Sequence, residues 1–397
     1  MIDVLVVGGG PAGNQTALSL ARNGHSVTVV DHRTELGDKL CTGIVGRECA
    51  ERYAVPSDLV YRRERGATVV SPNGRTVRIE REDEQALVID RARFVASIAD
   101  RARDAGANYM LGCRVSSLSV GDRRVVATTV ANHARGAMKP NEPIQARAVV
   151  IASGFNSLLP AMVGLASAAP AALAAQVQLR GDGLDSVKVL AHRHMPQGFF
   201  GWVVPTTPGR ALAGVFGRGR PRAALVSMLD GLRAEGAAFE LEGQPRAWGV
   251  PVRPAAVSYA ARVLLVGDVA GHTKPTTGGG IYYSLRCADL AGDVLHAALV
   301  DDDLSARALR PYEERWKGML GRELRLGYLA RRIYEQLGAR EVDSLLFLTA
   351  SNGLLKEGVR FDWHGDLVAR ALGYRLFEGI LSPFTRVTRK VDVGADD

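Results

Sequence analysis

The chain has 397 residues, of which 47% are hydrophobic and 23% are charged, and it carries a net charge of +8. This composition excludes a wholly disordered protein, and the length predicts two or three domains. Because the basic residues are scattered and not gathered in a dense run, we expect no nucleic-acid partner. Such a basic surface is either simply solvated or attracts anionic lipids or an acidic substrate.

The start of the chain lacks the basic and then apolar pattern of a signal peptide, so we expect a cytoplasmic protein. The uncharged stretch 157–179 is interrupted by Pro160 and Pro170, which argues against a membrane span and leaves a shallow, peripheral membrane contact as an alternative. The four cysteines have neither C-x-x-C spacing nor a nearby histidine at ligand spacing. We therefore expect reduced thiols and no metal site.

The first thirty residues predict a strand, a helix and a second strand. An apolar run over 2–7 is typical of a buried parallel strand, and apolar residues then recur at helical spacing as far as Ala21. Residues 27–31 predict the second strand, which ends on Asp31. This is the context in which a G-x-G-x-x-G pattern indicates dinucleotide binding, the alternative being a glycine turn of another α/β protein.

The glycines between the first strand and the helix each have a predicted purpose. Gly8 permits a tight turn, Gly10 lets the backbone approach a pyrophosphate, and Gly13 lets the helix pack closely on the strand. The helix N-terminus offers free N–H groups to phosphates, and Asp31 can accept hydrogen bonds from a ribose.

The next part of the chain, from residue 38 to the glycine turn after the strand that begins at Ala148, is predicted to contain a loop, a hairpin, a helix and several strands. We expect a loop over 38–47, a hairpin over 67–80 that turns at 72–74, and a helix over 93–105. Short strands follow over 108–148, and a buried strand from Ala148 ends in a glycine turn and returns to the first sheet.

A change of pattern between 174 and 251 predicts a second, antiparallel sheet with a covering helix. Its expected elements are strands at 175–179, 187–190, 201–205 and 211–216 and a helix at 223–236. A buried strand then leads into Gly267 and Asp268, a helix follows over 281–300, and the rest of the chain is predicted to be mostly helical.

The predicted fold class is α/β, or α+β taken over the whole chain. We expect a Rossmann-like FAD-binding domain made of 1–60, 85–160 and 258–303. An antiparallel-sheet substrate domain made of 61–84 and 161–257 is inserted into it, and 304–397 forms a C-terminal helical region.

Three nucleotide-type segments, at 8–31, 148–157 and 263–281, are what an extended FAD requires. The last of them would place Asp268 near the ribityl chain or the pyrophosphate. It would also point the N-terminus of the helix that starts near Gly280 at the flavin ring, where it favours negative charge.

The run 266–271 followed by 274–281, which ends Lys-Pro-Thr-Thr-Gly-Gly-Gly-Ile, resembles the signature of the geranylgeranyl reductase family. This family is a branch of the FAD-dependent hydroxylase-type superfamily. Residues 41–45 are similar to the cysteine loop of its archaeal-type, digeranylgeranylglycerophospholipid reductase-like members, and 91–94 resemble its Arg-x-x-Phe element. The resemblance covers the chain from residue 1 to about 335.

The resemblance implies FAD contacts at Ala12, Asp31, Cys41, Thr42, Arg91, Val115, Asp268, Gly280 and Ile281. Val115 rests only on its place in a strand of ordinary sequence. Cys41 would lie beside the flavin, where it acts as a proton donor or positions the substrate, or else packs as a small buried hydrophobe.

The family also has a substrate-pocket motif, Pro-x-x-Tyr-x-Trp-x-Phe-Pro, which 197–205 match in Trp202 and Pro205. Phe200 stands where the motif has tyrosine, so an apolar pocket survives. The resemblance implies that Phe199, Phe200, Trp202 and Pro205 bind a prenyl chain, and the alternative is that they form the core of the second sheet.

These observations predict an FAD-dependent reductase that saturates carbon–carbon double bonds of prenyl chains in membrane lipid precursors or related isoprenoids. One alternative is a flavin monooxygenase of the aromatic-hydroxylase type, and another is an FAD electron carrier or quinone-interacting protein. The sequence leaves the external electron donor open between NAD(P)H, a deazaflavin and ferredoxin, the last of which would be a protein partner.

Overall fold

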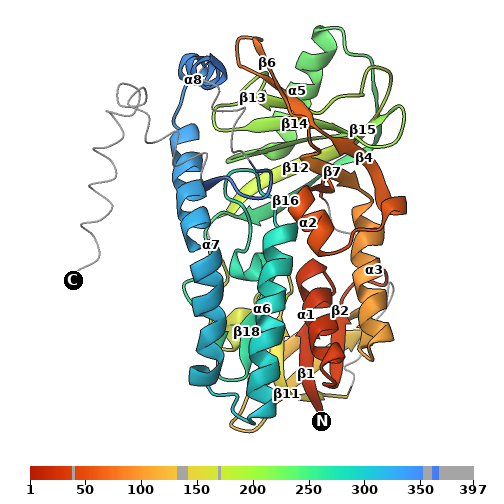
Figure 1. Cartoon of the computed structure of the whole chain (residues 1–397), viewed down its shortest axis with the longest axis vertical. Helices are drawn as coiled ribbons and strands as arrows, with labels where there is room; N and C mark the ends of the chain where they lie inside the picture. The colour runs from red at the N-terminus through yellow and green to blue at the C-terminus, as the bar shows by residue number, and fades with distance from the viewer. Residues whose placement is uncertain (38–40, 132–141, 169–170, 352–359, 366–397) are drawn as a thin grey trace, which may run out of the picture.

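The computed structural model describes residues 1–37, 41–131, 142–168, 171–351 and 360–365. Figure 1 shows one sheet at the end of the molecule that carries the N-terminus and a second sheet at the opposite end, with long helices lying over the first sheet and pointing toward the second. The first sheet has eight strands: β17 (Tyr259–Ala260), β18 (Val263–Leu265), β11 (Ile144–Ile151), β1 (Ile2–Val7), β2 (Val27–Asp31) and β8 (Asn108–Leu111) in that order, with β10 (Val125–Ala131) pairing to β11 and to β9 (Cys113–Val120).

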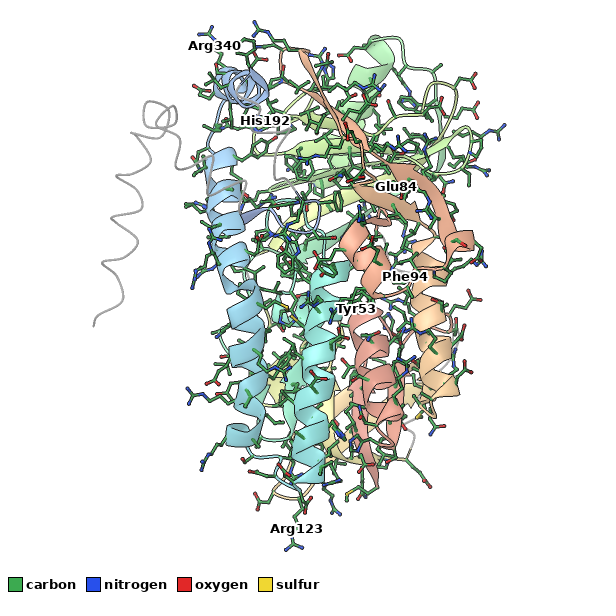
Figure 2. All side chains as sticks on the ribbon, in the orientation of Figure 1. Tyr53, Glu84, Phe94, Arg123, His192 and Arg340 are labelled. Atoms are coloured by element: carbon green, nitrogen blue, oxygen red, sulfur yellow. The ribbon has the colours of Figure 1, made fainter. Side chains whose placement is uncertain are left out.

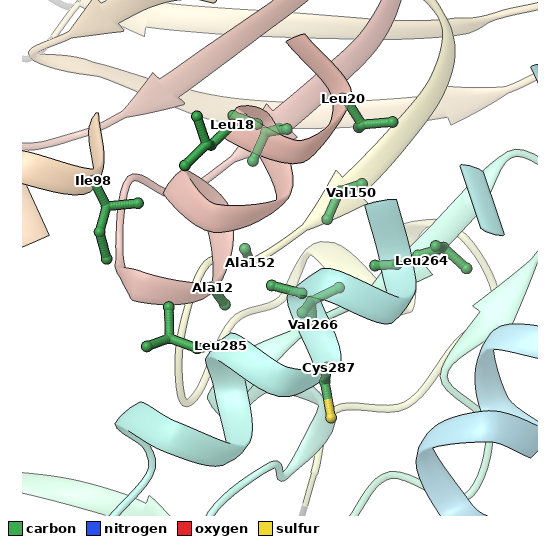
Figure 3. Close-up of a cluster of buried hydrophobic side chains, with 14 of the residues drawn as sticks. Ala12, Leu18, Leu20, Ile98, Val150, Ala152, Leu264, Val266, Leu285 and Cys287 are labelled. Atoms are coloured by element: carbon green, nitrogen blue, oxygen red, sulfur yellow. The ribbon is translucent and has the colours of Figure 1, made fainter. Parts of the chain in front are cut away.

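The centre of the first sheet is parallel, and β1 lies between β11 and β2. Its residues from Val4 to Val7 are at most 5% exposed because helices cover one face and a second apolar cluster covers the other. The covering helices are α1 (Pro11–Arg22), α3 (Arg91–Asp104) and α6 (Ile281–Val300). Figure 3 shows their shared core, in which Leu18 and Leu20 of α1 and Leu285 of α6 surround the ends of the strands.

The second sheet has seven strands: β16 (Glu240–Pro251), β12 (Ala171–Arg180), β15 (Arg210–Gly217), β14 (Phe200–Pro205), β13 (Lys188–Ala191), β5 (Gly66–Val70) and β6 (Thr76–Glu80). Alternate side chains of β12, β14 and β15 pack on α5 (Pro221–Ala234), which covers one face of the sheet. Its pairs are antiparallel except for β13 and β5, which are parallel.

A three-stranded sheet of β3 (Ile44–Gly46), β7 (Ala86–Ile89) and β4 (Val60–Glu64) joins the two larger parts. The two faces of β7 contribute to different cores, since Leu87 and Ile89 pack with the helices while Val88 packs with Val204 of the second sheet and with Val187 just before β13. The remaining elements are α2 (Arg47–Arg52), α4 (Leu159–Met162), α7 (Ala306–Tyr334), α8 (Ala339–Ser351) and the short 3-10 helices η1 (Ser57–Leu59) and η2 (Gly267–Ala270).

The long helices hold the layers together through buried polar contacts. The hydroxyl of Tyr53 donates a 2.8 Å hydrogen bond to Asp289 of α6, near the middle of the molecule in Figure 2. Tyr312 of α7 donates to the backbone oxygen of Leu265 at 2.8 Å. Arg340 on α8 and Arg123 near the first sheet mark opposite ends of the molecule in Figure 2.

The α/β fold class, the hairpin at 72–74 and the predicted order of strands and helices are confirmed. Two details differ. The loop expected over 38–47 contains β3, because 44–46 pair with β7, while 38–40 lie outside the described residues. The long edge strand β16 was not predicted, and the helical prediction for 304–397 is confirmed for α7 and α8, with 366–397 outside the described residues.

Across the described part of the chain, no helix is both long enough and apolar enough to cross a bilayer.

Candidate active site

A cavity of ≈ 1440 Å³ extends from the turn after β1 to the face of the seven-stranded sheet that α5 leaves uncovered. The predicted site residues that line it come from eight separate segments of the chain: Gly8, Gly10, Ala12, Asp31, Cys41, Thr42, Arg91, Val115, Phe200, Trp202, Asp268, Gly280 and Ile281. Gly13, Phe199 and Pro205 are not among the lining residues. The structure therefore brings most of the predicted cofactor and substrate residues around one space.

The glycine turn is shaped by two contacts that exclude side chains. Gly8 has a φ of 111°, and a Cβ there would overlap the backbone oxygen of Ala152. A Cβ on Gly13 would overlap the backbone oxygen of Gly8, so the helix can pack this closely only on glycine. Gly10, in contrast, has open space within 4 Å of where its Cβ would stand, which leaves room for a ligand against the backbone.

Asp31 organises the same turn from the end of β2. Its carboxylate accepts a 2.7 Å hydrogen bond from the backbone N–H of Gly9 and a 2.8 Å bond from that of Arg33. Asp31 is 3% exposed and borders the cavity. A carboxylate held in this way keeps lone pairs that can accept from a ribose hydroxyl.

The Cys41 loop is anchored to the second sheet by a residue that the sequence did not single out. Thr42 Oγ1 donates a 3.0 Å hydrogen bond to Gln176 Oε1, and Gln176 Nε2 lies 3.5 Å from the backbone oxygen of Cys41. Gln176 is buried in the middle of β12. A glutamine that directly follows the apolar run 171–175 is the signal that was available, because a buried amide needs polar partners.

Arg91 and Val115 line the cavity from different elements. Arg91 begins α3, is 8% exposed, and donates to the backbone oxygen of Gly37. Val115 lies in β9 and is 6% exposed. A buried guanidinium next to this cavity places positive charge where an anionic group would bind.

The turn after β18 positions Asp268 beside the start of α6. A Cβ on Gly280 would stand 3.1 Å from Asp268 Oδ1, so the carboxylate lies directly against the N-terminal turn of the helix. His272 holds the turn by accepting a 3.1 Å hydrogen bond from Gly267 N–H at its Nδ1. Burial lowers the pKa of His272 to about 3, so the imidazole is neutral, and its ring makes an edge-to-face contact with Trp316 outside the cavity lining.

Lys274 is buried in the cavity wall and faces an acidic residue from the C-terminal part of the chain. Its Nζ donates a 2.7 Å hydrogen bond to the backbone oxygen of Phe361 and lies 3.7 Å from Asp362 Oδ1. Lys274, Phe361 and Asp362 all line the cavity. Burial lowers the pKa of Lys274 and raises that of Asp362, while each charge partly offsets the effect of burial on the other.

The far part of the cavity is an apolar wall on the seven-stranded sheet. Phe200, Trp202 and Val204 alternate along β14 toward the cavity, and Phe216 joins them from β15. Phe199 belongs to the opposite face, where it packs with α5 and its ring covers Gly217. The two-residue period of a strand thus separates Phe199 from Phe200.

The cavity residues fit an FAD. The N-caps of α1 and α6 are Gly10 and Gly280, both line the cavity, and neither helix start has a side-chain capping bond in the part of the chain described. Their free N–H groups suit a pyrophosphate and the polar edge of a flavin ring. The Asp31 carboxylate can accept hydrogen bonds from the ribose hydroxyls of the same cofactor.

The chain is similar to several known proteins. A family model described as pyridine nucleotide-disulphide oxidoreductase matches residues 2–204. Digeranylgeranylglycerophospholipid reductase 1 of Methanopyrus kandleri is 32% identical over 377 residues, covering 90% of this chain and 96% of the relative. Digeranylgeranylglycerophospholipid reductase 2 of the same organism is 30% identical over 361 residues, covering 86% and 89%.

Among solved structures, a geranylgeranyl bacteriochlorophyll reductase-like protein from Thermoplasma acidophilum has a TM-score of 0.84 and 22% identity, and the match covers 96% of this chain and 98% of that one. This likeness shows the fold. The sequence relationships go further, and they confirm the resemblance found in the motifs: this chain belongs to the digeranylgeranylglycerophospholipid reductase family of FAD-dependent oxidoreductases.

Proposed function

We propose that this chain is an FAD-dependent reductase that saturates carbon–carbon double bonds in the prenyl chains of membrane lipid precursors or related isoprenoids. The observation that carries the proposal is the continuity of the cavity, which joins the uncapped start of α6 to the apolar wall of Phe200, Trp202 and Phe216 without a break. The names of the relatives supply the substrate class, a prenylated glycerophospholipid.

Reduced FAD, when bound, would supply the hydride for one alkene carbon. The other carbon needs a proton, and the Cys41 thiol is the donor in this proposal, with water restoring the thiol afterwards. The Thr42–Gln176 hydrogen bond fixes the loop that carries Cys41 against the second sheet. Burial of the apolar chain against the sheet holds an unactivated alkene in place and excludes water from it.

The polar end of the cavity serves the cofactor in the same proposal. Gly8, Gly10, Ala12 and Asp31 hold its nucleotide half, with Gly13 allowing the helix to approach. The remaining predicted contacts hold its flavin half or the linking phosphates: Cys41, Thr42, Arg91, Val115, Asp268, Gly280 and Ile281. The electrons come from an external donor of the NAD(P)H, deazaflavin or ferredoxin class.

The test is anaerobic. The FAD-loaded protein is reduced with dithionite, a geranylgeranylated glycerophospholipid is added, and flavin absorbance is followed together with the lipid mass. We expect reoxidation of the flavin in step with mass gains of two hydrogens. A flavin that stays reduced until oxygen is admitted, with unchanged lipid, contradicts the proposed substrate. Stopped-flow reduction by each donor class then identifies the donor.

A further inference from the structure

The cavity has a rim at the β16 edge of the second sheet that exposes apolar side chains. Leu158 is 76% exposed and Met162 is 45% exposed, and both line the cavity. Single exposed apolar residues are common on protein surfaces. Two of them on the mouth of one apolar cavity form a patch, and such patches mark contact surfaces.

Local structure prevents Leu158 from turning inward. Its neighbours Leu159 and Pro160 are buried, and Leu159 belongs to the apolar cluster under the first sheet. The Leu159 N–H lies 3.3 Å from Ser157 Oγ, and Ser167 Oγ donates a 2.8 Å hydrogen bond to the Ser157 backbone oxygen. Rotating the segment to bury Leu158 would expose Leu159, so the exposure of Leu158 is built into the fold.

Aromatic and cationic groups of the second sheet and of α5 line the same cavity. The ring of Phe155 lies so close over Gly249 that a Cβ there would overlap it, which joins the 155–162 segment to β16. Trp248 and Arg246, on the adjoining stretch of β16, also line the cavity. Arg222 reaches it from the first turn of α5, and both arginines are exposed.

Exposed apolar side chains together with a tryptophan and arginines are typical of a protein surface that binds an anionic bilayer. We propose that the rim formed by Leu158, Met162, Trp248, Arg222 and Arg246 docks on an anionic lipid bilayer. A prenyl chain then passes from the membrane into the cavity without crossing water. The direction of travel rests on the proposed function, while the docking itself does not. An acidic soluble protein would match the arginines and leave Leu158 and Met162 unexplained.

The test compares the binding of the FAD-loaded protein to vesicles by sedimentation. Vesicles of phosphatidylcholine with phosphatidylglycerol are set against phosphatidylcholine alone. We expect preference for the anionic vesicles, a partition coefficient about tenfold lower in Leu158→Glu, and one about fivefold lower in Arg222→Gln, with the arginine effect shrinking at high salt. The matched control is Val300→Glu, because Val300 is 67% exposed at the end of α6 and is not among the cavity-lining residues.

Equal binding by Leu158→Glu and Val300→Glu, or no preference of the unaltered protein for anionic vesicles, overturns the proposal. The proposal is also overturned if Arg222→Gln loses binding to an acidic redox protein but binds vesicles as well as the unaltered protein does. A second measurement distinguishes a failure of the docking proposal from a failure of the proposed function. With a prenyl lipid as substrate, the reduction rate of Leu158→Glu should fall more when the lipid is in vesicles than when it is dispersed in detergent. Equal falls in rate would place the effect of the substitution inside the cavity and would overturn docking. If the unaltered protein reduces no prenyl lipid in either form, the proposed function fails, and sedimentation still decides docking.

Discussion

The ammonium of Lys274 and the carboxylate of Asp362 lie 3.7 Å apart in the cavity wall, and their side chains are 6% and 4% exposed. The pair joins the loop before α6 to a segment 88 residues later in the chain. Asp362 also accepts a hydrogen bond from the Cys49 backbone N–H at 3.3 Å, which connects the same segment to α2. One wall of the candidate site therefore depends on charges from two distant parts of the chain.

Removing one partner of this pair leaves the other charge buried alone. We expect Lys274→Met to lower the free energy of unfolding by about 3–5 kcal/mol, and the double variant Lys274→Met/Asp362→Asn to lower it less than Lys274→Met does. Denaturant unfolding of all four proteins of the cycle measures the coupling. Additive losses would show that the two side chains do not stabilise each other.

Two buried histidines predict acid sensitivity. Burial lowers the pKa of His272 and of His364 to about 3, from an ordinary value of 6.5. Between these values the unfolded chain binds protons that the folded chain does not, so stability falls as the pH falls through that window. The expected slope is about 1.4 kcal/mol per pH unit for each histidine.

Denaturant unfolding at pH 6.5 and at successive lower values measures this slope. His364→Gln should remove one histidine's share of it. A slope equal to that of the unaltered protein would contradict a neutral His364, whose Nδ1 pairs with Thr276 and whose Nε2 lies 3.0 Å from the Phe361 backbone oxygen.

The glycine turn offers a pair of variants that separates folding from cofactor binding. Gly13→Ala puts a Cβ onto the Gly8 backbone oxygen and should cost about 1–3 kcal/mol of stability. Gly10→Ala meets no neighbour and should leave the unfolding free energy of the apoprotein nearly unchanged. Because that Cβ enters the space expected for the pyrophosphate, FAD should bind about tenfold more weakly, equivalent to about 1.4 kcal/mol. Thermal unfolding and a flavin fluorescence titration test both, and similar stability losses in the two variants would refute the assignment.

Adjacent phenylalanines should respond oppositely to the same substitution. Phe199→Leu opens space under α5 and should cost about 1–3 kcal/mol of stability without changing which prenyl chains are reduced. Phe200→Leu alters the cavity wall and should lower kcat/KM for the prenyl substrate with a smaller loss of stability. Unfolding experiments and a series of prenyl chain lengths measure the two effects. Equal changes in substrate preference would show that the opposite orientation of the two rings does not matter.

The role of Cys41 is tested by its rate effect. If its thiol supplies the proton, Cys41→Ala should lower the rate of alkene reduction by about 100-fold or more while FAD remains bound, and the solvent isotope effect should change. Cys287→Ala is the comparison, since Cys287 is buried in α6 and is not among the cavity-lining residues. Unchanged rates in Cys41→Ala would leave the thiol as a packing group.

Several parts of the site followed from the sequence because they are local. The glycine turn and the start of α6 each depend on contiguous residues whose backbone conformation and periodicity are set by their neighbours, and Arg91 was named from its resemblance to the Arg-x-x-Phe element of the family. Their gathering around one cavity was also anticipated, because the three nucleotide-type segments at 8–31, 148–157 and 263–281 are what an extended FAD requires.

Other parts were decided only by tertiary structure. A strand's period shows that Phe199 and Phe200 face opposite ways, but which face borders the cavity depends on where α5 packs. The role of Gln176 depends on its contact with the Cys41 loop, and the role of Asp362 depends on its contact with Lys274. Both partners lie far away in the chain. Sequence alone determined the nucleotide-binding elements and the family of this protein. The pairing of its buried polar groups and the apolar rim at Leu158 were set by long-range packing, because a side chain's burial and partners depend on which distant segments cover it.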